Sequence, residues 1–335
     1  MLHPSRSLTF GTSERPKVDV KRIGIVRCRI GLLMGTLCFA SACSAQEAAK
    51  GQPIFKFHSG FWVNLHQFLH AEATASDAPR SDSPEWRRAV EYYRLEIVRH
   101  PLLSDELAAV NNRLSEAGSA SELRAVDLEP GLAATLTQAA PIYRHAWWPQ
   151  HNRSNLEWID AVQPLIAKHG AAIAKDIAAA YRVDWPAKPI RTDVSAYAGP
   201  NGAYTTVMPV HITISSADRG YQGMAALEML FHEASHTLDE KIRQALTREL
   251  DVSSKLFRRR GFEHAILFYT AGEMTRRYVA NYEPYGIKNG TLERGWPGSL
   301  AVLEKDWKPY LEGRTNLAAA LHAIVADYGV PKNAP

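Results

Sequence analysis

The stretch LEMLFHEASHTLDE, residues 227–240, constrains the fold more than any other part of the chain. Its apolar positions have helical spacing, and no proline interrupts it. Four residues of α-helix turn about 400°, so His232 and His236 project from one face, one turn apart. Two imidazoles with the neighbouring Glu233 carboxylate, on or near a buried face, are costly unless another group compensates them. The chain must therefore bring a second element to this face.

This spacing predicts a metal site. Two imidazole nitrogens one helical turn apart can reach one Zn²⁺ at about 2 Å. Glu233 is rotated by about 100° from His232, so it is poorly placed as a ligand but can reach a water molecule as general base. With 13 His and 21 Glu in 335 residues, about 0.03 HExxH patterns are expected by chance. We therefore expect His232 and His236 as zinc ligands and Glu233 as the catalytic residue, rather than a core helix with two hydrogen-bonded histidines.

The segment resembles the zincin metallopeptidases, whose HExxH motif it matches at His232, Glu233 and His236. The resemblance extends over residues 195–283, as a strand with edge character, the motif helix and a second helix. It implies a zincin-like metallopeptidase core. In that superfamily the edge strand lies along the cleft and pairs with an extended peptide substrate, and GAYTTVMPVHITISS (202–216) is placed for that role.

The third ligand decides the zincin subgroup. The metzincin pattern HExxHxxGxxH is excluded, because Asp239 stands where its glycine belongs and Ile242 where its histidine belongs. The Gly-Thr context of the aspzincins is also not found. Gluzincins take a glutamate from a following helix, and YTAGEMTRR offers Glu273 beside the small residues Ala271 and Gly272. The resemblance thus implies a gluzincin-like metal site of His232, His236 and Glu273.

Alternatives for the third ligand remain open. Glu273 has a structural explanation as well, a salt bridge to Arg276 or Arg277. The third ligand would then come from another residue, and the candidates are His264, Glu263 and Asp251. Zincins often stabilise the oxyanion with a tyrosine or histidine, and the candidates for that role are Tyr278, Tyr282 and Tyr285. Asp239, one turn after His236, is placed to orient an imidazole.

The first half of the chain is rich in alanine and has helical spacing. Helices are expected at 61–73, 86–100, 104–118 and 119–128, with Ser104 and Ser121 as N-caps and Gly118 as a stop. From about residue 183 the sequence is rich in Thr, Val, Ile and Tyr, which predicts two or three strands. Pro209 inside this region favours an edge strand or a bulge. Further helices are expected at 224–246 and 262–282, with two more after them.

These elements predict an α+β fold, predominantly α-helical with a small mixed sheet. We expect a helical N-terminal lobe at 43–190, the zincin-like catalytic core at 191–290 and C-terminal helices packed on the core at 291–335. The ordinary content of 46% hydrophobic and 22% charged residues is typical of a globular protein.

Residues 1–42 read as a secretory signal peptide. Lys21, Arg22 and Arg27 precede an apolar run at 30–40, and the small residues of 40–42 form a cleavage site. Cys43 follows directly, as in a bacterial lipoprotein signal, although Ala40 stands where a leucine is usual. The run is too short to span a bilayer. We therefore expect export to the periplasm or outer envelope of a bacterium, either released or lipid-anchored through Cys43, with no transmembrane body.

The leader also changes how the charge is interpreted. Residues 1–42 hold seven Lys or Arg and two Asp or Glu, so their net charge is +5 and the remainder of a +4 chain carries about −1. The basicity thus gives no reason to expect a nucleic-acid partner. The predicted function is an exported zinc-dependent hydrolase acting on a peptide or protein. The alternatives are a zinc hydrolase of a non-peptide substrate and a non-catalytic envelope binding protein with a helical recognition lobe.

Overall fold

The computed structural model describes residues 53–120, 122–123, 126–249 and 261–329. The predicted leader, Cys43, Ser121 and Asp251 lie outside the described residues. Among the described helices, none is both long enough and apolar enough to cross a bilayer.

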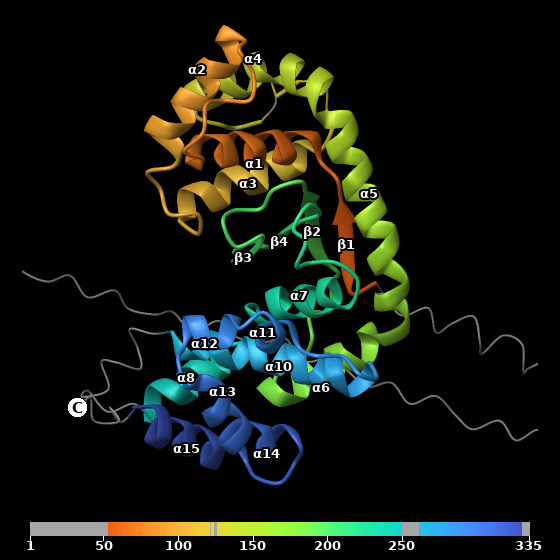
Figure 1. Ribbon diagram of the computed structural model, residues 1–335, viewed down its shortest axis with the longest axis vertical. Helices are drawn as coiled ribbons and strands as arrows, with labels where there is room; N and C mark the ends of the chain where they lie inside the picture. Colours follow the sequence, from red (N-terminus) through yellow and green to blue (C-terminus); the bar gives the residue numbers. More distant parts are fainter. Residues whose placement is uncertain (1–52, 121, 124–125, 250–260, 330–335) are drawn as a thin grey trace, which may run out of the picture. The chain divides into compact units, whose positions relative to one another are not determined.

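A four-stranded mixed sheet organises the described residues (Figure 1). Its strands are β1 (Phe55–His58), β2 (Ile190–Ser195), β3 (Ala203–Val207) and β4 (Val210–Ser215), in the order β1-β2-β4-β3. β1, β2 and β4 are parallel, whereas β3 is antiparallel to β4 and forms an edge. Pro209 lies in the turn between β3 and β4, so it interrupts no strand. The edge strand predicted for this region is found as β3.

Helices make up most of the remaining structure. Between β1 and β2 lie α1 (Phe61–Thr74), α2 (Pro84–Tyr92), α3 (Asp105–Ala117), α4 (Pro130–Ala146), α5 (Trp148–Leu165) and α6 (Ala171–Tyr181). After β4 come α7 (Met224–Ser235), α8 (Glu240–Glu249), α10 (Phe262–Tyr278), α11 (Tyr285–Lys288), α12 (Thr291–Gly295), α13 (Ser299–Val302), α14 (Lys308–Leu311) and α15 (Leu317–Gly329). π-Helical turns lie at Tyr93–Ile97, Ile166–Gly170 and Leu303–Trp307. The predicted α+β class, mostly helical with a small mixed sheet, is confirmed.

Helix ends follow the local sequence in several places. The hydroxyl of Ser104 accepts a hydrogen bond from the Leu107 amide at 3.3 Å, and α3 begins at the next residue. Gly118 ends the helix with φ of 57°, a value that favours glycine. The helix predicted at 119–128 is not found among the described residues of that range.

The single long helix predicted at 224–246 is wrong, because α7 ends at Ser235 and α8 begins only at Glu240. In the turn between them, amides bond three residues back: Thr237 to the Ala234 carbonyl at 3.0 Å, and Leu238 to the Ser235 carbonyl at 2.9 Å. The Thr237 hydroxyl also bonds the Ala234 carbonyl, at 2.8 Å. Such side-chain bonds to nearby backbone compete with the helix, so the break follows the second histidine of the motif closely.

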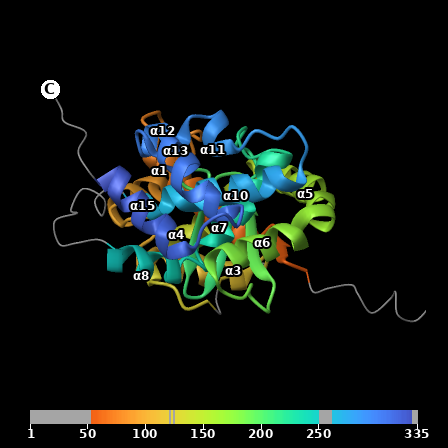
Figure 2. The same ribbon diagram turned by 90° about the horizontal axis from the view of Figure 1, so that it is seen from below.

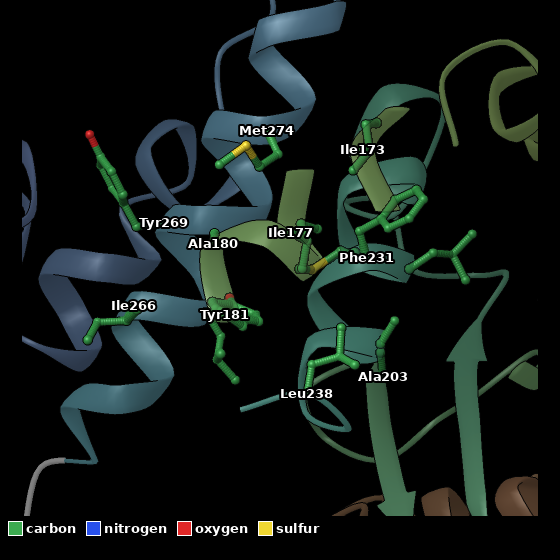
Figure 3. Packing of buried hydrophobic residues seen from close by; sticks show 14 of the residues in the cluster. Ile173, Ile177, Ala180, Tyr181, Ala203, Phe231, Leu238, Ile266, Tyr269 and Met274 are labelled. Carbon is green, nitrogen blue, oxygen red and sulfur yellow. The ribbon is translucent and has the colours of Figure 1, made fainter. Parts of the chain in front are cut away.

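One face of the sheet is apolar and packs on α5 and α7. The Phe55 ring lies edge-on to Phe231 of α7, and Phe57 lies edge-on to Trp158 of α5. The same core continues into α6 and α10, and Figure 3 shows Ile177 of α6 near Phe231. This face therefore fixes the motif helix directly against the sheet.

The opposite face of the sheet is polar and faces α1 and α3. Buried Asp193 of β2 accepts hydrogen bonds from His211 Nε2 at 2.6 Å and Arg191 Nε at 2.7 Å. Burial alone would raise the pKa of Asp193, but these two donors hold it below its usual value. Asn111 of α3 reaches the Thr213 hydroxyl of β4 at 3.0 Å. A layer of buried, hydrogen-bonded polar side chains thus joins the helices to the sheet.

The described residues contain two hydrophobic clusters. One lies within α1–α4 and runs from Phe61 to Tyr143. The other contains the sheet, α5, α6 and the helices after β4. The helices α5 and α6 thus pack with the sheet, whereas α1–α4 have a cluster of their own. Residues 52–335 form one unit by their contacts.

Candidate metal centre

Three histidines from two helices converge. His232 lies in the last turn of α7, His236 is the residue that caps its end, and His264 lies in the first turn of α10. One ligand nitrogen from each ring falls in a group whose members lie within 4.8 Å of one another. Nε2 of His264 is 3.1 Å from Nε2 of His232. Two nitrogens on one tetrahedral zinc ion are about 3.3 Å apart, so this pair already has nearly that separation.

Aromatic rings hold the imidazoles in place. Phe268, one turn after His264 on α10, stacks on His232 with ring centroids 3.7 Å apart. Trp296 lies edge-on to His264 at 5.3 Å. His232 is 2% exposed and Trp296 is 8% exposed, whereas His236 and His264 are partly exposed, so the cluster is buried on the side of His232 and reaches solvent on the other side. Packed rings keep few rotamers, which limits the imidazoles to converging positions.

Burial keeps all three imidazoles neutral. It lowers the pKa of His264 to about 4 and, with help from the nearby His264 ring, that of His236 to about 3. Burial and the two neighbouring rings lower the pKa of His232 well below its usual value. Neutral imidazole is the form that binds a metal. No carboxylate of the described residues joins this cluster, and neutral imidazole nitrogens are well suited to bind a cation.

Glu233 directly follows His232 on α7 and is 6% exposed. Its Oε2 accepts a hydrogen bond of 2.6 Å from the hydroxyl of Thr205 on the edge strand β3. Burial raises the pKa of Glu233 to about 7, although the bond from Thr205 opposes the shift. The motif carboxylate therefore lies between the motif helix and the edge of the sheet.

Glu273, the third ligand expected from the sequence, is not a member of the histidine group. Its carboxylate forms a salt bridge with Arg276, the alternative that the sequence left open. Burial raises the pKa of Glu273, and Arg276 opposes this shift. His264, another of the sequence alternatives, takes the place beside His232 and His236.

Helical geometry explains why α10 presents His264 rather than Glu273. Nine residues of α-helix turn about 900°, which leaves the two side chains about 180° apart, and they are separated by about 13 Å along the axis. The side chains of His264 and Glu273 therefore cannot both face the end of α7 that carries the motif histidines. The i,i+3 spacing of Glu273 and Arg276 was already visible in the sequence and is typical of a surface pair.

The tyrosines that the sequence suggested for an oxyanion have other partners. Tyr278 donates to Asp176 at 2.9 Å, and Tyr282 donates to Glu228 at 2.8 Å. The Tyr285 ring lies 5.4 Å from that of Tyr221. Asp239, expected to orient an imidazole, accepts a hydrogen bond from Arg243 Nε at 2.9 Å instead.

Close packing of α10 on α7 brings the cluster together (Figures 1 and 2). A Cβ added at Gly272 of α10 would lie 2.6 Å from Pro284 Cβ and 3.3 Å from Glu228 Oε1 of α7. The small residue expected to allow this approach therefore does so. Glu228, one turn before His232, also accepts a bond from the Tyr285 amide at 2.9 Å.

We expect Glu228 to make the fold less stable at alkaline pH. Burial raises its pKa to about 7, while the bonds from Tyr285 and Tyr282 oppose the shift. Between its unfolded pKa and pH 7 the folded state binds more protons than the unfolded state, so the free energy of unfolding falls as pH rises. The loss is on the order of 3 kcal/mol above pH 7 and absent below pH 4.

The variant Glu228→Gln stays neutral and keeps an acceptor for Tyr282 and Tyr285. Urea unfolding should show little difference from the wild type at pH 4.5 and a gain of roughly 2–3 kcal/mol for the variant at pH 8. An equal difference at both pH values would show that Glu228 does not carry this dependence.

The donor set fits zinc. Three imidazole nitrogens can occupy three corners of a tetrahedron and leave the fourth for water or substrate, as in catalytic zinc sites.

Comparison with protein-family models, curated proteins and solved structures found no match for the chain.

Proposed function

We propose that the protein is a zinc-dependent hydrolase whose metal is held by His232, His236 and His264. The observation that carries this proposal is the convergence of three neutral imidazole nitrogens, one of which belongs to His232, the residue directly before the buried Glu233 in the motif helix. When bound, zinc supplies a Lewis acid that polarises a carbonyl and acidifies water. Three neutral ligands leave the charge of the ion undiminished, which favours that chemistry.

Glu233 acts as the general base in this proposal. Its carboxylate accepts a proton from the attacking water and then delivers it to the leaving group. The buried position of Glu233 keeps bulk water from competing for the proton. The surrounding rings of Phe268 and Trp296 hold the imidazoles and offer no competing ligand.

A peptide is the substrate class that the arrangement supports best. β3 is an antiparallel edge strand that contacts the motif helix α7. An edge strand can pair with an extended chain through backbone hydrogen bonds. The predicted leader would place this activity outside the cytoplasm.

Elemental analysis tests the metal. We expect one zinc ion per chain in the purified protein, and loss of hydrolysis on dialysis against a chelator with recovery when zinc is returned. Substrate class is read from a peptide library by mass spectrometry, with p-nitrophenyl esters in parallel. Protein without zinc would contradict the proposal, and cleavage of esters alone would replace the peptide substrate.

A further inference from the structure

Thr205 makes the one hydrogen bond to the Glu233 carboxylate found among the described residues. Its side chain is on the apolar face of the sheet, in register with Ile212 of β4 and, one strand further, Thr192 of β2. This row faces α7. Thr205 is only 9% exposed, so water does not readily replace it as a donor to the carboxylate.

The hydroxyl of Thr205 has two acceptors on the same residue. Oγ1 lies 2.6 Å from Glu233 Oε2 and 3.0 Å from the Glu233 backbone oxygen. A hydroxyl has one proton, so it can donate to the carboxylate or turn to the carbonyl. The carbonyl belongs to the last turn of α7, where backbone acceptors lack a full set of helical partners.

We propose that Thr205 is the positioning residue for Glu233. Its hydroxyl holds the carboxylate in one rotamer before the reaction. As water adds to the substrate carbonyl, its oxygen forms a bond to the carbonyl carbon, one of its O–H bonds breaks, and the released proton forms an O–H bond on Oε2 of Glu233. The Thr205 hydroxyl then turns to the backbone oxygen and keeps its own proton throughout. The inference rests on the proposed function, since it assigns Glu233 the role of base.

The geometry also ties the base to the edge strand. Thr205 is in the middle of β3, the strand that an extended substrate would pair with. A side chain on a strand of the sheet holds its partner more precisely than one on a loop. Glu233 would thus keep a fixed relation to any peptide bound along β3.

Three variants test the role. Thr205→Val removes the hydroxyl at nearly constant volume, and Thr205→Ser keeps it. Thr192→Val is the matched control, because Thr192 is buried on the same sheet face and its hydroxyl bonds only the Ile190 carbonyl among the described residues. We expect Thr205→Val to lower kcat by roughly 10- to 100-fold with KM changed less than about 3-fold. The other two variants should stay within about 3-fold of the wild type.

A second readout does not depend on turnover. Acetohydroxamic acid binds a metal and donates a hydrogen bond to a nearby base, and its affinity is measured on the cobalt-substituted protein by visible absorption. Thr205→Val should weaken the binding of acetohydroxamic acid about 10-fold. Zinc content should stay unchanged, and so should the affinity for azide, because azide binds the metal without donating a hydrogen bond to a base.

The outcomes separate the two proposals. A zinc-loaded wild type without hydrolysis would remove the proposed function, while the hydroxamate measurement would still test Thr205. Equal kcat and equal hydroxamate affinity for the valine and serine variants would overturn the positioning role. The positioning role would also be overturned if Thr205→Val lost more zinc or more thermal stability than Thr192→Val, because Thr205 would then have a structural role.

Discussion

Replacing His264 with alanine is expected to abolish tight zinc binding. The imidazole of His264 is 3.1 Å from that of His232, and no carboxylate from the described part of the chain belongs to the group. Loss of a residue that only hydrogen-bonds a metal ligand lowers metal affinity by roughly 10- to 100-fold. Loss of one of the three ligands themselves should lower zinc affinity by more than this. Hydrolysis should disappear with the metal. Zinc content after gel filtration and competition with a chromogenic chelator measure the effect.

Two controls separate ligation from packing. Glu273→Gln breaks the salt bridge with Arg276 but should leave zinc content unchanged, because His264 and not Glu273 lies beside the motif. His70→Ala removes another buried imidazole, from α1, and should also keep the metal. If Glu273→Gln lost zinc while His264→Ala retained it, the ligand set implied by the gluzincin resemblance would replace the one proposed here.

The second large effect is expected from Glu233→Gln. The amide has the shape of the carboxylate but cannot accept and return a proton, so kcat should fall by about 10³-fold or more. Zinc content should stay at one ion per chain, because the three histidines remain. Activity is followed on the best peptide from the library, with bound zinc determined on the same samples.

Glu228→Gln is the matched control for this variant. Glu228 lies on the same helix, is also buried, and burial raises its pKa to about 7 as well. Its partners are Tyr282 and the Tyr285 amide rather than Thr205. Turnover should therefore survive in Glu228→Gln. Similar losses of kcat in both variants would indicate a packing effect. Full activity in Glu233→Gln would exclude Glu233 as the general base.

Local signals predicted much of the secondary structure. The aromatic and leucine pattern at 61–73 became α1, and Ser104 and Gly118 mark the ends of α3. Such features depend on residues within one or two turns of each other. The prediction of a continuous helix through 224–246 is wrong because hydrophobic spacing continues across the break. The turn instead depends on hydroxyl and backbone bonds of Ser235 and Thr237.

The sequence by itself determined the motif and its local geometry. His232, Glu233 and His236 follow from helical periodicity, which is a short-range property. Pro209 led to the prediction of an edge strand, but it lies in the turn after β3, so the order of the strands in the sheet, and not the missing amide, makes β3 an edge. Only the tertiary structure decided what completes the site. The packing of α10 on α7 brings His264 to the motif and turns Glu273 away, and the register of β3 places Thr205 against Glu233. These contacts join residues 28 or more positions apart, and their choice depends on how whole helices and strands pack, which no local pattern records.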